Sequence, residues 1–181
     1  LVMGMSLEPP HLDPTAGAAA AIDEIVYANV FEGLTRIGSN GEVLPSLAQN
    51  WDISEDGLIY TFKLRAGVTF HDGTPFNAEA VAYNVDRVQN HPNTKVPADL
   101  AAVESVDVID DLTVQFNLNR PDSGVVGILA DRAGMMVSPT AAEAANEAQL
   151  NNTPVGTGPF MLSEYSEGDR LLVERNPDYW Q

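Results

Sequence analysis

Three histidines are the side chains of this sequence best suited to acid–base chemistry or metal binding near neutral pH. They are His11, His71 and His91, and none has a partner at ligand spacing, such as i, i+4 on a helix. Cysteine is absent, so the chain holds no disulfide, thiol nucleophile or cysteine-based metal site. We therefore expect neither a metal nor another cofactor.

Two short motifs could belong to an enzyme. His71-Asp72 pairs an imidazole with a carboxylate, but a turn whose polar side chains bond locally explains it better. Gly156-Thr157-Gly158 could cradle a phosphate, yet it lacks the G-K-[ST] ending, and no helix pattern follows it. We interpret it as a tight turn where the backbone re-enters a sheet. The sequence has no G-x-S-x-G motif either.

Arg132 is one of only nine basic residues, against 26 acidic ones. A guanidinium can grip a carboxylate through two parallel hydrogen bonds, so Arg132 could meet a ligand carboxylate. The alternative is an ion pair with Asp131 or with another acidic residue of the chain. Met135 and Met136 follow closely; they could line an apolar pocket, but core packing is the favoured interpretation.

The elements that must position these residues are clearest in Trp51–Phe76. Within it, Leu58–Arg65 alternates apolar and polar residues, and this period of two predicts a strand with one better-buried face. Asp56-Gly57 predicts a hairpin turn before the strand, and Asp72–Pro75 predict a turn after it. Asn77 is then the expected cap of a helix.

Further elements follow the same rules. Val81, Val85 and Val88 share one face of the helix after Asn77, and Val103–Asn119 forms a second hairpin pattern. Two hairpins separated by a helix predict a small antiparallel or mixed sheet. Another strand pair is expected around Gly168-Asp169.

The two ends of the chain are less regular. Leu1–Leu7 is apolar and is expected to form a buried strand. Ile22–Phe31 has the apolar spacing of a helix, with Gly33 as its expected C-cap. Ser138-Pro139 should open an alanine-rich helix that runs to about Leu150.

The amino-acid composition excludes several classes of function. The net charge of −17 argues against nucleic acid and against an anionic membrane surface, both of which attract Lys and Arg. An apolar content of 44% is typical of a globular chain. The sequence contains no apolar run of eighteen residues that could span a membrane.

One long pattern is specific. The run W-x-x-S-x-D-G-x-x-Y-T-F-x-L-R-x-G-V-x-F-H-D-G-T-P-F-x-A-E, from Trp51 to Glu79, resembles the signature of the extracytoplasmic solute-binding proteins of family 5. These are the peptide, dipeptide and nickel-chelate receptors of ABC importers. L-D-P, F-E-G-L, L-P-S-L-A, G-T-G-P-F and E-R-N-P-D-Y-W resemble the family in the same order, so the likeness covers essentially the whole chain.

The resemblance implies an α/β fold: a periplasmic-binding-protein-like lobe of type II, with a mixed sheet, flanking helices and the extra subdomain of family 5. Residues 1–41 and 154–181 would belong to the main sheet domain, and residues 42–153 to the extra subdomain. Family members are more than twice this long. The chain would therefore be an incomplete first lobe, with the hinge, the second lobe and the signal peptide outside it.

The function implied is that of a receptor, not an enzyme, that closes two lobes on a small peptide or peptide-like solute and delivers it to a membrane permease. A metal chelate, glutathione or a sugar are alternative ligands within the class. The implied location is periplasmic or lipid-anchored outside the cytoplasm, and the full-length protein would be a monomer. From another class, a hydrolytic enzyme or a stand-alone interaction domain stays open.

The resemblance also implies ligand-binding residues. In nickel-chelate receptors an arginine at the step that matches Arg132 lines the cleft. In oligopeptide receptors the residues after L-D-P border the ligand, which here are Gly17, Ala18, Ala19 and Ala20. Their small side chains would let a peptide backbone come close; the alternative is the alanine-rich start of a helix. The oligopeptide type has an acidic residue in this loop, whereas this chain has none before Asp23.

Overall fold

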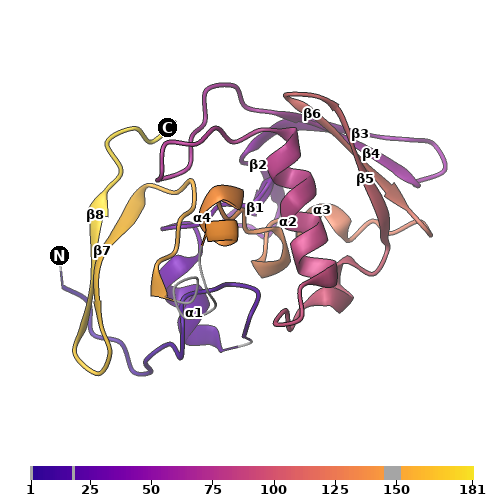
Figure 1. Ribbon diagram of the computed structural model, residues 1–181. Coiled ribbons are helices and arrows are strands. Elements are labelled where there is room, and N and C mark those ends of the chain that lie inside the picture. Colours follow the sequence, from indigo (N-terminus) through magenta and orange to yellow (C-terminus); the bar gives the residue numbers. More distant parts are fainter. Residues whose placement is uncertain (1, 18, 145–151) are drawn as a thin grey trace.

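The computed structural model describes residues 2–17, 19–144 and 152–181 (Figure 1). Its strands are β1 (Thr35–Ile37), β2 (Val43–Pro45), β3 (Ala48–Ile53), β4 (Ile59–Leu64), β5 (Val103–Asp110), β6 (Thr113–Leu118), β7 (Phe160–Ser166) and β8 (Arg170–Arg175). Its α-helices are α1 (Ala20–Val26), α2 (Ala78–Asn90), α3 (Val125–Ile128) and α4 (Pro139–Ala144). Two 3-10 turns, η1 (Pro97–Leu100) and η2 (Arg132–Gly134), connect them.

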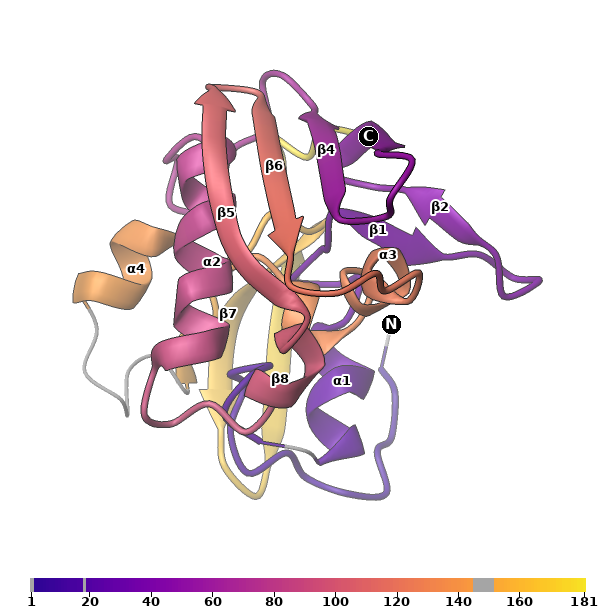
Figure 2. The ribbon, with the colours of Figure 1, turned by 90° about the vertical axis from the view of Figure 1, so that its right-hand side faces the viewer.

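A four-stranded antiparallel sheet in the order β3-β4-β6-β5 forms one half of the molecule (Figures 1 and 2). Of the two predicted possibilities, antiparallel or mixed, the structure has the antiparallel one. Tyr60, Phe62 and Leu64 of β4 are buried on one face, as the alternating pattern predicts. Gly57 has φ +69° in the predicted hairpin turn between β3 and β4.

Helix α2 covers the buried face of this sheet (Figure 2). The Asn77 side chain accepts a hydrogen bond from the Ala80 N–H at 3.0 Å, which confirms the predicted cap. Val81, Val85 and Val88 are buried in the core beneath the sheet. Local sequence therefore sets both the start of α2, through the Asn77 cap, and its buried face, through valines at helical spacing.

The other half contains α1 and the β7–β8 hairpin, which Figure 1 shows on the side away from β5, whereas the short β1–β2 pair lies beside α3 and β3. The predicted strand pair around Gly168 is confirmed, and Gly168 takes φ +75° at the turn. A second apolar cluster fills this half; its buried members are Leu12, Ile22, Val26, Val30, Phe31, Met135 and Val137. The expected domain boundaries at residues 41/42 and 153/154 stay a prediction.

Glu32 ties the C-terminal segment to the rest of the molecule. Its buried carboxylate accepts hydrogen bonds of 2.9 Å from Thr157 Oγ1, Tyr179 Oη and Trp180 Nε1. Burial raises the pKa of Glu32 even though these three donors lower it. Arg65 stacks on the Trp180 ring, 4.5 Å from its centroid, and adds positive charge beside the carboxylate.

Two predicted elements near the N-terminus are wrong. Residues 2–7 form no strand, no described strand pairs with them, and Val2 is 96% exposed. An apolar run becomes a strand only where a neighbouring backbone takes up its N–H and C=O groups. The helix expected over Ile22–Phe31 ends at Val26 instead.

The early end of α1 has a local cause. Tyr27 is extended, and Ala28 has φ +55°, so the backbone turns out of the helix. Val30 and Phe31 stay buried in the second apolar cluster, and both donate their N–H to the Val26 carbonyl. Gly33 is therefore not a C-cap. A Cβ on it would lie 2.2 Å from the Leu129 carbonyl oxygen, so glycine is needed there for close backbone packing.

The helix predicted from Pro139 to about Leu150 is seen as α4, and the Ala141 N–H bonds the Ser138 cap at 3.2 Å. Its expected continuation over residues 145–150 lies outside the described residues.

Candidate ligand-binding site

Arg132 and the loop around Gly17 come together although they are more than a hundred residues apart in the chain. Arg132 Nη1 donates to the Gly17 carbonyl at 3.1 Å, and Nη2 donates to Asp23 Oδ2 at 2.5 Å. Asp23 lies on α1, and Arg132 begins η2. The Arg132 and Asp23 side chains are 18% and 26% exposed, so solvent reaches the pair.

The alternative interpretation of Arg132, an ion pair with an acidic residue of the chain, is confirmed for Asp23. Asp131 instead accepts the backbone N–H of Arg132 at 2.8 Å. The two side-chain bonds use two of the five N–H donors of a guanidinium, which leaves donors for a further partner. The ligand contact of Arg132 stays a prediction.

Opposing effects act on the carboxyl group of Asp23. Burial raises the pKa of its carboxyl, the Arg132 charge only partly offsets this, and Asp131 adds to it. The Oδ1 atom is buried and has no hydrogen-bond partner among the described residues. The ion pair therefore satisfies one carboxylate oxygen and leaves the other without compensation.

The small residues of the predicted site lie where α1 begins. Gly17 is half-buried, and a Cβ on it would come within 2.7 Å of His11 Nε2 and 3.2 Å of Ile22 Cδ1. Ala19 is the half-buried N-cap residue of α1, and Ala20 is exposed. Ala18 lies outside the described residues. The alternative of a helix start rich in alanine is thus confirmed for Ala19 and Ala20, and their ligand role stays a prediction.

The structure contains a buried ion pair behind this loop that the sequence analysis does not predict. Arg87 of α2 donates to Asp13 Oδ2 through Nη2 and to Thr15 Oγ1 through Nη1, the latter at 2.8 Å. The N–H and Oγ1 of Thr15 both donate to Asp13 Oδ1 at 2.9 Å. The side chains of Arg87 and Asp13 are each 5% exposed. The signal available in the sequence is an arginine beside the valine face of α2 in a chain poor in bases.

Met135 and Met136 are 2% and 1% exposed, and they belong to the two apolar clusters. The core-packing interpretation of both methionines is confirmed.

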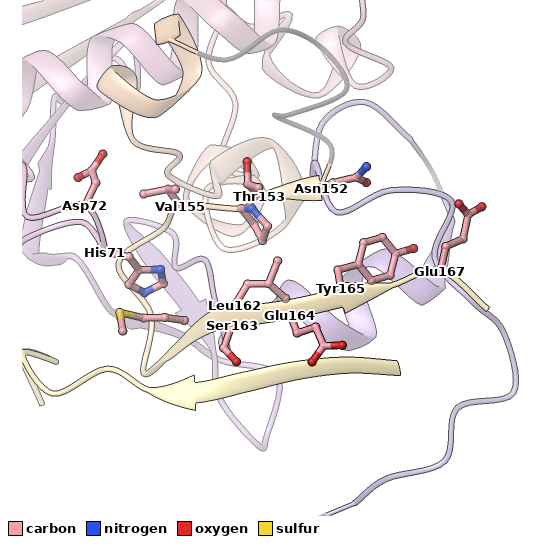
Figure 3. A pocket seen from close by; sticks show the side chains of 12 residues that line it. His71, Asp72, Asn152, Thr153, Val155, Leu162, Ser163, Glu164, Tyr165 and Glu167 are labelled. Atoms are coloured by element: carbon pink, nitrogen blue, oxygen red, sulfur yellow. The ribbon is translucent and has the colours of Figure 1, made fainter. Parts of the chain in front are cut away.

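A hollow of about 710 Å³ lies elsewhere, between β7 and the segment 152–155 (Figure 3). Figure 3 shows Leu162 and Tyr165 pointing from β7 toward that segment, with His71 and Asp72 at one end. Gly17, Ala19, Ala20 and Arg132, the predicted ligand-binding residues that the structure describes, do not line this hollow.

The polar atoms of His71 and Asp72 are engaged by neighbouring backbone and hydroxyl groups. The Gly156 N–H reaches His71 Nδ1 at 3.3 Å, so Nε2 is the protonated nitrogen that bonds the Gly158 carbonyl at 2.9 Å. Burial lowers the pKa of His71, which favours the neutral ring.

The Asp72 carboxylate is likewise engaged in structural hydrogen bonds. It accepts hydrogen bonds from Thr74 N, Thr74 Oγ1 and Ser138 Oγ. Burial alone would raise the pKa of Asp72, but these bonds outweigh it and lower the pKa. The turn interpretation of His71-Asp72 is confirmed, with added bonds to distant segments.

The glycines of Gly156-Thr157-Gly158 serve backbone packing. A Cβ on Gly156 would lie 2.1 Å from the Val30 carbonyl oxygen, and one on Gly158 would lie 2.4 Å from that of Asn29. The Gly158 N–H donates to the Val30 carbonyl at 3.0 Å. The motif is a close contact between two backbones and not a phosphate loop.

The described residues contain neither a metal-binding cluster nor a membrane-spanning helix. No group of three or more His, Asp or Glu side chains in residues 2–17, 19–144 and 152–181 could hold a metal ion. Within those same ranges, every helix is too short or too polar to cross a membrane.

Comparison with known proteins identifies the family. The profile described as "Bacterial extracellular solute-binding proteins, family 5 Middle" matches residues 42–181. The chain belongs to this family. Glutathione-binding protein GsiB of Pectobacterium atrosepticum is 37% identical over 171 residues, which are 94% of this chain and 33% of GsiB. This family 5 chain thus spans about one third of the length of the curated relatives it matches.

Solved structures of similar proteins share the fold. NikZ from Campylobacter jejuni, in complex with Ni(L-His), has a TM-score of 0.85 at 28% identity, over 96% of this chain and 35% of NikZ. DppA from Helicobacter pylori, in complex with peptide STSA, has a TM-score of 0.83 at 27% identity, over 94% of this chain and 38% of DppA. The predicted periplasmic-binding-protein lobe is confirmed, and GsiB and DppA are named as binding proteins.

Proposed function

We propose that this chain is part of the substrate-binding receptor of an ABC importer, and that it captures small peptides or peptide-like solutes. Membership of family 5 carries the receptor function, and the position of Arg132 carries the assignment of a ligand contact. Its partly exposed guanidinium is fixed against the Gly17 loop and keeps N–H donors beyond its two described side-chain bonds. A family 5 chain with this arrangement offers a fixed cation to a small anionic group.

The ligands of similar structures have this group in common. Four of them are complexes with the peptide STSA, Met-Leu, agropinic acid and Ni(L-His). Every one of these ligands carries a carboxylate. Arginine binds carboxylates well because its N–H groups form a planar fork. A carboxylate is therefore the ligand group that we assign to Arg132.

Gly17, Ala18, Ala19 and Ala20 complete this proposal as the surface along which the ligand backbone lies. The absence of side chains beyond Cβ at these positions removes steric barriers to close approach. Asp23 competes with the ligand for Arg132, so a bound carboxylate shares the guanidinium with it.

The proposal includes the rest of the transport cycle. The second lobe closes on the ligand by a hinge, and the closed receptor docks on a membrane permease. The receptor is monomeric and works in the periplasm or tethered outside the cytoplasm. That it binds solutes and is not an enzyme is supported by His71-Asp72, the one adjacent imidazole–carboxylate pair of the sequence, whose polar atoms are engaged in structural hydrogen bonds.

Calorimetry on the full-length gene product tests the proposal. The ligands are di- and tripeptides with a free C-terminal carboxylate and the same peptides as C-terminal amides. The variants are Arg132→Ala and, as a control, Arg120→Ala, since Arg120 is exposed and its described side-chain bond goes only to neighbouring Asn119. We expect Arg132→Ala to weaken binding of the free-carboxylate peptide severalfold or more and binding of the amide much less. Arg120→Ala should bind both forms with native affinity.

Two results would contradict the proposal at different levels. If no peptide or peptide-like solute binds the native protein, the receptor function falls. If peptides bind but Arg132→Ala binds both forms as tightly as the native protein does, Arg132 is not a ligand contact, and the receptor function stands.

Glutathione is a second candidate ligand. The curated relatives that match at 35–37% identity carry the name glutathione-binding protein. Glutathione is a peptide-like solute with two carboxylates, so it suits the same guanidinium. Including reduced glutathione and a nickel–histidine chelate in the calorimetric series separates these alternatives from ordinary peptides.

A further inference from the structure

The loop that leads to Gly17 is fixed from outside the site. Arg87, which is 6% exposed, projects from α2 and binds both Asp13 and Thr15. A second bond from the same side supports this grip, because the Lys95 N–H donates to the Thr15 carbonyl at 2.8 Å. Residues 87 and 95 follow each other along α2 and the turn after it, so one segment of the chain holds Thr15 twice.

This hold is rigid for three reasons. The ion pair is sealed from solvent, since each of its side chains is 5% exposed, and water cannot easily replace either partner. Pro14 lies between Asp13 and Thr15, and its ring fixes one backbone dihedral. The Thr15 N–H bonds back to Asp13 Oδ1 at 2.9 Å and closes the turn.

The held residue lies next to the candidate site. Thr15 precedes Gly17 by two residues, and two residues of chain span at most about 7 Å. Gly17 is in turn bound through its carbonyl by Arg132. The loop is therefore held at one end by the sealed arginine, Arg87, and at the other end by the open one, Arg132.

We propose that Arg87 is a positioning residue for ligand binding: through Asp13 and Thr15 it holds the Gly17 loop in the arrangement that the ligand requires. This inference rests on the proposed function, and it assigns a role to α2, which otherwise packs under the four-stranded sheet. The segment from α2 to η1 packs in the apolar core of that sheet, so the sheet half of the molecule takes part in binding without touching the ligand.

The expected size of the effect follows from populations. When only a fraction of molecules has the competent loop, the apparent Kd rises by the inverse of that fraction. If loss of Arg87 leaves the loop competent about one tenth of the time, the Kd rises about tenfold. The bond between Arg132 and Gly17 limits the loss, because it still holds the other end.

The test compares Arg87→Met with Val88→Ala in the full-length gene product. Val88 is the next residue of α2 and is buried in the sheet core, so its truncation lowers stability without touching the loop. Both variants are measured well below their melting temperatures with the peptide that the native protein binds best. We expect about tenfold weaker binding for Arg87→Met and native affinity for Val88→Ala.

Hydrogen exchange distinguishes local loosening of the loop from a general loss of stability, and the measured affinity then shows whether the ligand requires the held loop. The Thr15 N–H should exchange faster in Arg87→Met and at the native rate in Val88→Ala, because its acceptor Asp13 loses its partner only in the first variant. Thr15→Val is the milder variant if Arg87→Met does not fold. It removes the hydroxyl between Arg87 and Asp13 and should weaken binding severalfold.

Native affinity in both Arg87→Met and Thr15→Val overturns the inference, and so does equal weakening by Val88→Ala. Either result leaves the receptor function intact as long as the native protein binds peptide. Absence of peptide binding by the native protein is instead a failure of the proposed function.

Discussion

Two arginines hold the same short segment of the chain, Arg87 at Asp13 and Arg132 at Asp23, and their surroundings differ. The Arg87 pair is sealed, with both side chains 5% exposed, whereas the side chains of the Arg132 pair are 18% and 26% exposed. Both guanidiniums also bind a second group of the segment, a hydroxyl in one case and a carbonyl in the other.

The difference separates two tasks that one residue type can perform. A sealed pair cannot meet a solute, but breaking it leaves a buried charge without compensation. An open pair contributes little to stability, yet its remaining donors stay available to a ligand. The segment between the pairs is thus anchored at one end and chemically accessible at the other.

The largest expected effect is on the sealed pair. Arg87→Met should lower the free energy of unfolding by about 3–5 kcal/mol, because it leaves the Asp13 carboxylate buried without its partner. Urea unfolding measures this loss. The double variant Asp13→Asn/Arg87→Met should be less destabilised than Arg87→Met alone, since the unpaired charge is then gone. A loss below about 1 kcal/mol in Arg87→Met would place this pair with ordinary surface pairs and erase the contrast.

Gly17 lies between the two pairs and gives a smaller effect. In Gly17→Ala the new Cβ would overlap His11 Nε2, which must move because the distance is 2.7 Å. The end of a side chain can shift, so we expect a loss of stability of about 1 kcal/mol, together with weaker ligand binding. Gly4→Ala is the control, because a Cβ there meets nothing within 4 Å. Equal melting temperatures for the two variants would mean that His11 does not restrict the loop.

The parts of this arrangement that sequence reasoning anticipated depend on neighbours in the chain. The buried face of β4 follows from alternation over a few residues, and the Asn77 cap binds an N–H three residues away. Such features are set by local geometry and are visible in a single sequence.

The parts that sequence reasoning missed depend on partners far along the chain. Asp13 and Arg87 are 74 residues apart, and the Asp23–Arg132 pair spans 109 residues, so no spacing rule connects them. The strand expected over Leu1–Leu7 failed for the related reason that pairing partners are long-range. Arg132 was recognised as special because bases are scarce, but its partner Asp23 was not.

Truncating the open pair should have a small effect on stability. Arg132→Ala is expected to lower the free energy of unfolding by about 1 kcal/mol or less, because solvent screens the pair. A double-mutant cycle with Asp23→Ala measures the coupling between the two side chains, and added salt should reduce it. A coupling as large as that of Arg87 with Asp13 would show that partial exposure does not distinguish the pairs.

The pH dependence of the open pair is the finest test of the contrast. Burial raises the pKa of Asp23 above its ordinary 3.8 despite Arg132, so the charged form is disfavoured in the folded state. The stability contributed by this carboxyl is then fully present below its unfolded pKa and is lost as pH rises through the folded pKa. Asp23→Asn removes the titration.

Unfolding of the native protein and of Asp23→Asn should therefore be compared from about pH 3.5 to about pH 7. The difference, native minus variant, should decline as pH rises. A difference that grows with pH would mean that Arg132 more than offsets the burial of Asp23. The open pair would then behave as a stabilising ion pair, and sharing Arg132 with a ligand carboxylate would cost part of that stabilisation.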